Sequence, residues 1–178
     1  MSNCFFYAFA TSVVSFIYTL ILFFLGFHGE KMEQGQLLAW GGLVILAVGL
    51  FLAVRAAKAE KVEAGEGFSY GNGFSTAFLT SVFVAVFSAI LAFVYASYIN
   101  PEMADHAWRI QEQAMIEQGM SDEQIGQVEG FTRTIMKPGL QAVFGFFGSL
   151  VTGLILSLII AIFTRKKVED DLGTNPAG

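Results

Sequence analysis

Residues 74–99 constrain the fold of this chain more than any other segment, because they contain no Asp, Glu, Lys, Arg or His. About 20 consecutive apolar residues suffice to cross the roughly 30 Å hydrocarbon core of a bilayer as a helix. At about 1.5 Å per residue this segment reaches roughly 39 Å, so the helix must tilt or project into the headgroups. The segment therefore predicts a membrane-spanning helix.

Three further segments have the length of a membrane span and carry no charge: residues 5–27, 37–54 and 139–163. Charged residues make up only 14% of the chain, well below the quarter or so typical of soluble domains. The first segment is longer than the about 7–15 apolar residues of a signal peptide, and no basic residue precedes it. We predict one all-α, polytopic membrane domain over residues 1–178, with four transmembrane helices and an uncleaved first span.

Residues 100–138 form the longest polar segment, and two amphipathic patterns divide it. Asn100 followed by Pro101 is typical of an N-cap and the first residue of a helix, and Ser121 with Gln124 forms a capping-box pattern. The apolar stripes expected to pack together are Met103, Ala107, Ile110 and Ala114, beside Trp108, on the first helix, and Ile125, Val128, Thr132 and Ile135 on the second. The segment predicts an α-helical hairpin between the third and fourth spans.

The predicted hairpin is rich in acidic residues, and it is the largest element expected in water. Ion pairs at helical spacing are expected between Asp105 and Arg109 and between Glu129 and Arg133. The acidic residues expected to face a partner are Glu102, Asp105, Glu112 and Glu117.

The basic residues indicate how the spans are oriented. Four spans place both termini and the link at residues 65–73 on one side of the membrane. That side holds Arg55, Lys58, Lys61, Arg165, Lys166 and Lys167, and the other side holds Lys31, Arg109, Arg133 and Lys137. Basic residues that flank spans mark the cytoplasmic side. We expect both termini in the cytoplasm, the hairpin outside the cytoplasmic (inner) membrane, and a disordered tail at residues 168–178.

Small residues spaced four apart predict close contacts between helices. These residues are Ser81, Ala85 and Ala89 in the third span, and Ser149, Gly153 and Ser157 in the fourth. The glycines of residues 65–73 lack the GxGxxG spacing of a phosphate loop, and no strand precedes them. We interpret that segment as a flexible interfacial link with Phe68 and Tyr70 among the headgroups.

The absence of ionisable residues from the four predicted spans limits the classes of function that we expect for the chain. Ion-coupled transport and intramembrane hydrolysis usually place such residues inside the membrane, so we expect neither an enzyme nor a bound cofactor. The net charge of −5 argues against nucleic acid as a partner, and the single Cys4 excludes an intrachain disulfide. Weak candidates for an external metal site are His28, Glu102 and His106, together with Glu30.

Two functional hypotheses follow from these patterns. The first is a structural or accessory subunit that lies in the lipid bilayer and presents its acidic hairpin to a partner outside. The alternative is a small-solute transporter or channel formed by oligomerisation. Its path would be lined by Ser81, Ser88, Ser149, Thr152 and Ser157. The partner in the membrane would be a second copy or another membrane protein.

Several motifs also resemble a known family. They are FSYGNGFSTAF at residues 68–78, YINPE at the end of the third span, GMSDEQI in the hairpin and KPG before the fourth span. Over residues 67–167 the chain resembles the bacterial family called domain of unknown function 4199. The resemblance implies a small integral membrane protein with four spans, and it implies no catalytic or binding residues.

Overall fold

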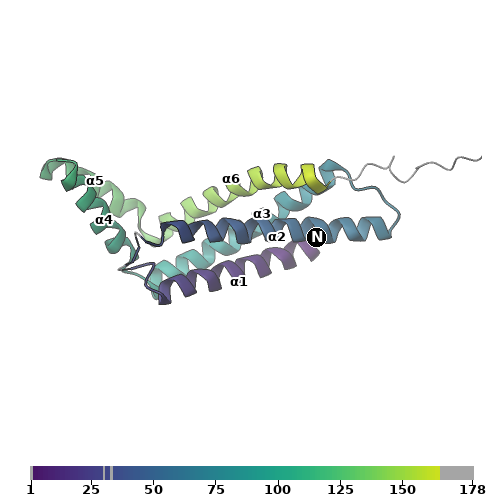
Figure 1. The fold of residues 1–178 in the computed structure, drawn as a ribbon, viewed down its shortest axis with the longest axis horizontal. Helices are drawn as coiled ribbons and strands as arrows, with labels where there is room; N and C mark the ends of the chain where they lie inside the picture. The colour runs from purple at the N-terminus through teal and green to yellow at the C-terminus, as the bar shows by residue number, and fades with distance from the viewer. Residues whose placement is uncertain (1, 30, 33, 165–178) are drawn as a thin grey trace, which may run out of the picture.

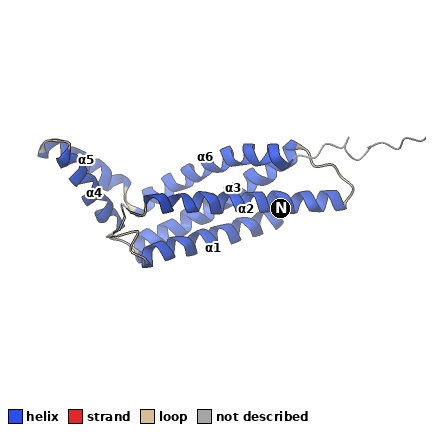
Figure 2. Cartoon of the chain, viewed as in Figure 1, coloured by secondary structure: helices blue, strands red, loops and turns tan. Residues whose placement is uncertain are grey.

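The computed structural model describes residues 2–29, 31–32 and 34–164 of the chain, and these ranges contain helices and loops but no strand (Figure 2). The elements are α1 (Ser2–Phe24), η1 (Gln36–Ala39), α2 (Trp40–Glu63), α3 (Tyr70–Val94), η2 (Tyr95–Ile99), α4 (Met103–Glu117), α5 (Asp122–Ile135) and α6 (Pro138–Thr164). The predicted basic cluster Arg165, Lys166 and Lys167, the predicted disordered tail 168–178 and Glu30 lie outside the described residues.

Four long helices, α1, α2, α3 and α6, run side by side in a bundle (Figure 1). Within the described residues these four helices are long and apolar enough to cross a membrane, which confirms the predicted all-α class and the four spans. Large apolar side chains cover their outer faces, as in Phe24 and Phe163, which are about four-fifths exposed. The start of α1, the link after α2 and the end of α6 lie at one end of the bundle, and α4 and α5 project from the other end (Figure 1).

The first two spans begin and end at residues that differ from the prediction. Helix α1 stops at Phe24 rather than at residue 27, because Gly26 adopts a positive φ of 84° that a helix cannot continue. The chain reaches Trp40 through the 3-10 turn η1, so the second α-helix starts three residues later than expected. It continues past the apolar segment to Glu63, and Gly65, with φ 73°, follows its end.

The link predicted at residues 65–73 is shorter in the structure, where only residues 66–69 are irregular before the next helix, and its interpretation is wrong for Phe68. Helix α3 already begins at Tyr70, because the Ser69 side chain accepts a hydrogen bond from the Asn72 N–H at 3.2 Å. Phe68 is 1% exposed and does not lie among headgroups. It packs in a cluster formed by Leu50, Val54, Phe68, Ala77 and Ile160. Burial of a Phe side chain contributes about 1.5–3 kcal/mol to the free energy of folding, so Phe68 stabilises this end of the bundle.

Helices α4 and α5 pack on each other through a small core of their own, formed by Trp108, Met115 and Ile125. The capping box of Ser121 and Gln124 is confirmed. The predicted stripe of α4 is wrong at Ala114, which is exposed, because Trp108 and Met115, seven residues apart, turn their shared face towards α5. The predicted start of α4 is also wrong, because the helix begins at Met103 and Asn100 caps nothing.

One arginine ties the two helices of the hairpin together. Arg133 donates hydrogen bonds to Glu129 at 2.6 Å, as predicted, and to Asp105 at 2.9 Å. Asp105 therefore pairs across the hairpin with Arg133 and not with Arg109. The packing of α4 against α5 brings Arg133 close to Asp105, although the two residues are distant in sequence. Hydrogen bonds from its guanidinium to Glu129, and then to Asp105, raise the pKa of Arg133 above its usual value.

Candidate functional site

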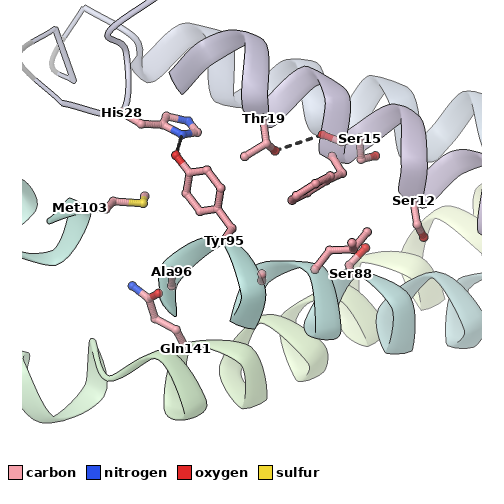
Figure 3. A pocket seen from close by; sticks show the side chains of 12 residues that line it. Ser12, Ser15, Thr19, His28, Ser88, Tyr95, Ala96, Met103 and Gln141 are labelled. Atoms are coloured by element: carbon pink, nitrogen blue, oxygen red, sulfur yellow. Dashed lines mark hydrogen bonds between the residues drawn. The ribbon is translucent and has the colours of Figure 1, made fainter. Parts of the chain in front are cut away.

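A network of buried polar groups joins three segments at the hairpin end of the bundle. His28 Nδ1 lies 2.6 Å from the hydroxyl of Tyr95, and Figure 3 shows the two side chains pointing at each other. Asn100 Nδ2 donates to the Tyr95 hydroxyl at 3.2 Å and to the His28 backbone carbonyl at 3.0 Å. The network therefore holds the loop after α1 against the end of α3.

The π-helix η2 positions this network. It ends the third span at Tyr95–Ile99, and the Asn100 N–H closes it by donating to the Tyr95 carbonyl at 2.9 Å. Such π-turns occur often at functional sites, because the extra residue redirects the side chains that follow. Here Tyr95 and Asn100 are both almost fully buried, and the Tyr95 ring meets Phe23 edge to face.

The geometry at Tyr95 favours a neutral His28. Because Asn100 donates to the Tyr95 oxygen, the Tyr95 O–H can donate to an unprotonated His28 Nδ1. Burial also lowers the pKa of His28 below its ordinary value of 6.5. A proton on Nδ1 would leave the Tyr95 hydroxyl without its acceptor.

This network stands at the mouth of a polar cleft between α1, α3 and the first turn of α6. The cleft has a volume of about 350 Å³. Figure 3 shows side chains that project into it from α1, from α3 and, in Gln141, from α6. Its polar lining residues are Ser12, Ser15, Thr19, His28, Ser88, Tyr95 and Gln141. A second cavity of about 460 Å³ lies among α1, α2, α3 and α6 and includes Gly145, Gly148, Ser149 and Thr152.

Tight contacts hold α6 against α3 and α2. Gly153 of α6 lies against Ser81 of α3, and a Cβ added at Gly153 would be 2.5 Å from the Ser81 Cβ. Lys58 of α2 donates to the carbonyl of Thr164 at 2.8 Å, at the negative end of the α6 dipole. A pocket of about 460 Å³ borders Lys58 and Thr164, so these contacts join the three helices without closing this end of the bundle.

Some of the small residues predicted to pack between helices are buried in the structure, and others are only half-buried. Ser81, Ala85, Gly153 and Ser157 are buried where α3 and α6 meet, and the Ser157 hydroxyl donates to the Gly153 carbonyl at 2.6 Å. Ala89 and Ser149 are only half-buried, and Ser149 lines the second cavity.

The weak metal candidates line a common cavity without forming a ligand set. His28, Glu102 and His106 all border a space of about 620 Å³ at the root of the hairpin. His28 uses Nδ1 for Tyr95, and His106 Nε2 lies 4.0 Å from the Glu102 carboxylate. Within the described residues, no three His, Cys, Asp or Glu side chains are placed to hold a metal ion.

The four acidic residues expected to face a partner do not share one surface. Glu102 is largely exposed at the root of α4, and Asp105 is engaged by Arg133. Asp105 and Glu112 lie two turns apart on one face of α4, whereas Glu117 lies on another face near the tip. Glu117 accepts a hydrogen bond from Gln113 at 3.3 Å.

Sequence reasoning missed the role of Tyr95 and assigned Asn100 to a helix cap. The Asn-Pro pair after an apolar run is typical of a cap, and a π-turn leaves no recognisable spacing in a single sequence. It also missed the exposed apolar side chains of the hairpin, Ile116 and Phe131, which are 59% and 69% exposed. Both are apolar residues that lie outside the two predicted apolar stripes, and this is the sequence signal that could have identified them.

The fold and the cleft define a class: an all-helical, multi-pass membrane protein with a helical hairpin at one end of its bundle. A family model described as Protein of unknown function (DUF4199) matches residues 7–166. The chain belongs to this family, which confirms the resemblance in the motifs. No curated protein and no solved structure matches the chain at a significant level.

The His28 network predicts a dependence of stability on pH. Because the folded state holds the His28 pKa below 6.5, the unfolded chain binds more protons in that range. Stability is therefore complete above about pH 6.5 and falls as the pH is lowered through the folded pKa. Thermal unfolding between pH 5 and pH 8 measures this effect. We expect His28→Gln to reduce the loss of thermal stability at low pH, and His106→Gln to leave that loss unchanged. The reverse result would assign the loss to His106.

Proposed function

We propose that this protein is an accessory subunit of the cytoplasmic membrane that presents the α4–α5 hairpin to a partner on the extracytoplasmic side. The observation that carries the proposal is the hairpin itself. It stands off the end of the bundle (Figure 1) and has its own core of Trp108, Met115 and Ile125. An element that folds around its own core and extends away from its bundle is suited to bind another molecule.

The surface of the hairpin supports a partner of particular chemistry. Exposed carboxylates at Glu102 and Glu117 favour a basic surface, since complementary charge steers association. Ile116 and Phe131 add apolar side chains that a partner would cover, and aromatic residues are enriched among those that dominate binding energy. We expect a partner with basic residues around an apolar recess.

The proposed orientation rests on charge. Arg55, Lys58 and Lys61 lie on the part of α2 farthest from the hairpin. Basic residues next to spans are retained in the cytoplasm, so the end of α2 is cytoplasmic and the hairpin is outside. The hydrogen bond of Asn3 to Glu60 at 2.5 Å supports the same placement for the N-terminus.

Charge neutralisation on the hairpin tests this function. In Glu102→Gln/Glu117→Gln we expect a partner captured with the wild-type protein to be retained about tenfold less, because two carboxylates of the contact are lost. The measurement is quantitative mass spectrometry of the purified membrane complex. Glu63→Gln/Glu66→Gln is the matched control, because it removes two charges at the other end of the bundle.

Deletion of residues 101–137 completes the test. The four spans should still insert, and the partner should be absent from the purified protein. If every partner remains bound without the hairpin, the hairpin is not the binding element and the proposal is wrong.

The alternative, a small-solute transporter or channel formed by oligomerisation, is favoured by one observation. Ser88, Ser149 and Thr152, three of the five residues expected along its path, line the cavities of the bundle. The other two, Ser81 and Ser157, are buried where α3 meets α6 and line neither of these two cavities. Solute flux into liposomes that contain the purified protein separates this function from the accessory role.

A further inference from the structure

The two cavities of the bundle meet at a pair of serines. Ser15 of α1 and Ser88 of α3 line both the cleft of about 350 Å³ and the second cavity of about 460 Å³. Each volume lies within the roughly 300–1,000 Å³ of ordinary ligand sites. The two cavities therefore adjoin, and we call them together the bundle cleft. It runs from His28 at the hairpin end to the region between α2 and α6.

The polar groups of the bundle cleft fall into two sets. Ser12 and Thr19 each donate to a carbonyl of their own helix, as the buried hydroxyls of Thr80, Ser81 and Ser157 do. Five further polar side chains, Ser15, Ser88, Gln141, Ser149 and Thr152, are half-buried in the lining of the bundle cleft. Because no buried side-chain nitrogen or oxygen of the described residues lacks a partner, their hydroxyl and amide groups stay accessible and can bond to a molecule in the bundle cleft.

The charge of the bundle cleft restricts that occupant. Among the described residues, no Asp, Glu, Lys or Arg lines either cavity, and the one titratable base, His28, is already hydrogen-bonded to Tyr95. No described lining residue therefore carries a permanent charge that would balance an ionic head. Leu43, Leu46 and Leu91 provide an apolar wall beside the hydroxyls. An uncharged molecule with a polar head and an apolar chain fits both parts.

The bundle cleft also has a lateral opening. Gly145 and Gly148 of α6 line it and are exposed, and Gly42 of α2 lines the other side. A Cβ added at any of these three glycines would meet no atom within 4 Å. Since the outer faces of α2 and α6 are apolar and face lipid, this opening leads into the bilayer.

We propose that the bundle cleft binds an uncharged, single-chain amphiphile that enters sideways from the bilayer between α2 and α6. Its hydroxyl or amide head bonds to Ser15, Ser88 and Gln141. Its apolar chain lies along Leu43 and Leu46 and leaves through the gap at Gly145 and Gly148. The site does not depend on the partner of the hairpin, so the failure of either proposal leaves the other standing.

Photolabelling of the whole protein in phosphatidylcholine nanodiscs tests the proposal. The probe is monolauroylglycerol that carries a diazirine in its chain, and mass spectrometry maps the labelled residues. We expect saturable labelling of the α2 and α6 segments that line the bundle cleft, with unlabelled monolauroylglycerol as an effective competitor. Labelling confined to the lipid-facing surface, without saturation, would overturn the proposal.

Two variants fill the space from different sides. Ser88→Phe blocks the junction of the two cavities, and Gly148→Leu fills the lateral opening, where its side chain has room. Each should reduce cleft labelling about tenfold. Val86→Phe is the matched control, because it places the same phenyl ring on the exposed face of α3. If both filling variants keep native circular dichroism and full labelling, the site is wrong.

Two competitors establish the chemistry and the source of the ligand. Lauric acid at pH 8, an anion with the same chain, should compete at least about tenfold less well than monolauroylglycerol, because the bundle cleft has no charge to pair with it. Glycerol should not compete, because it lacks the chain that leads to the bilayer. Equal competition by lauric acid would contradict the uncharged site, and equal competition by glycerol would contradict lateral access from the membrane.

Discussion

Gly153→Val is expected to force α3 and α6 apart and to destabilise the whole bundle. The new Cβ would lie 2.5 Å from the Cβ of Ser81 and 2.6 Å from its hydroxyl oxygen. Ser81 is buried and its side chain is short, so the helix backbones must move to relieve the clash. Overpacking of this kind costs about 3 kcal/mol, which for a chain of this size lowers the melting temperature by roughly 6–12 °C. Thermal unfolding followed by circular dichroism measures it.

Gly145→Val provides the matched control on the same helix. A Cβ at Gly145 meets no atom within 4 Å, so the same side chain should leave the melting temperature within about 2 °C of wild type. If both variants lower the melting temperature by the same amount, the loss of stability does not come from the contact between Gly153 and Ser81. If neither variant is destabilised, the close approach of Ser81 and Gly153 is wrong.

Trp108→Ala is expected to unfold the hairpin while the four spans stay folded. Trp108 is 3% exposed and is the largest side chain of the hairpin core. Its truncation costs about 3–5 kcal/mol. Helices α4 and α5 have 15 and 14 residues, and isolated helices of that length are marginal in water. Amide hydrogen exchange should therefore rise through residues 103–135 and stay unchanged in the spans.

Ile116→Ala serves as the control for this change, since Ile116 is more than half exposed and its truncation should leave exchange unaltered. Faster exchange in α3 and α6 of Trp108→Ala would show that hairpin and bundle unfold as one unit. Unchanged exchange everywhere would show that Trp108 does not hold the hairpin together.

The sequence predicts the four spans well because length and the absence of charge determine what crosses a bilayer. The capping box at Ser121 and the ion pair of Glu129 with Arg133 are also predictable, since both are local in the chain. The pairing of Asp105 with Arg133 is not, because it depends on how α4 packs against α5. Phe68 shows the same limit, because its burial depends on helices that are distant in sequence.

The bundle cleft was the part of the site that the sequence could not reveal. Hydroxyl side chains in a membrane helix look alike in sequence, whether they donate to their own backbone, as Ser157 does, or line a cavity, as Ser88 does. Whether a hydroxyl lines a cavity depends on how far apart the neighbouring helices lie at the hairpin end. The His28–Tyr95–Asn100 network depends in turn on the π-turn that ends α3.

The central claim is that the helices cross a membrane with the hairpin on the opposite side from the link between α2 and α3. Cysteine accessibility in intact bacterial cells tests it most directly, with the native Cys4 replaced by Ser. A membrane-impermeant maleimide should label Glu112→Cys in intact cells and Glu66→Cys only after the membrane is opened. Labelling of both sites in intact cells, or of Glu66→Cys alone, would contradict the account.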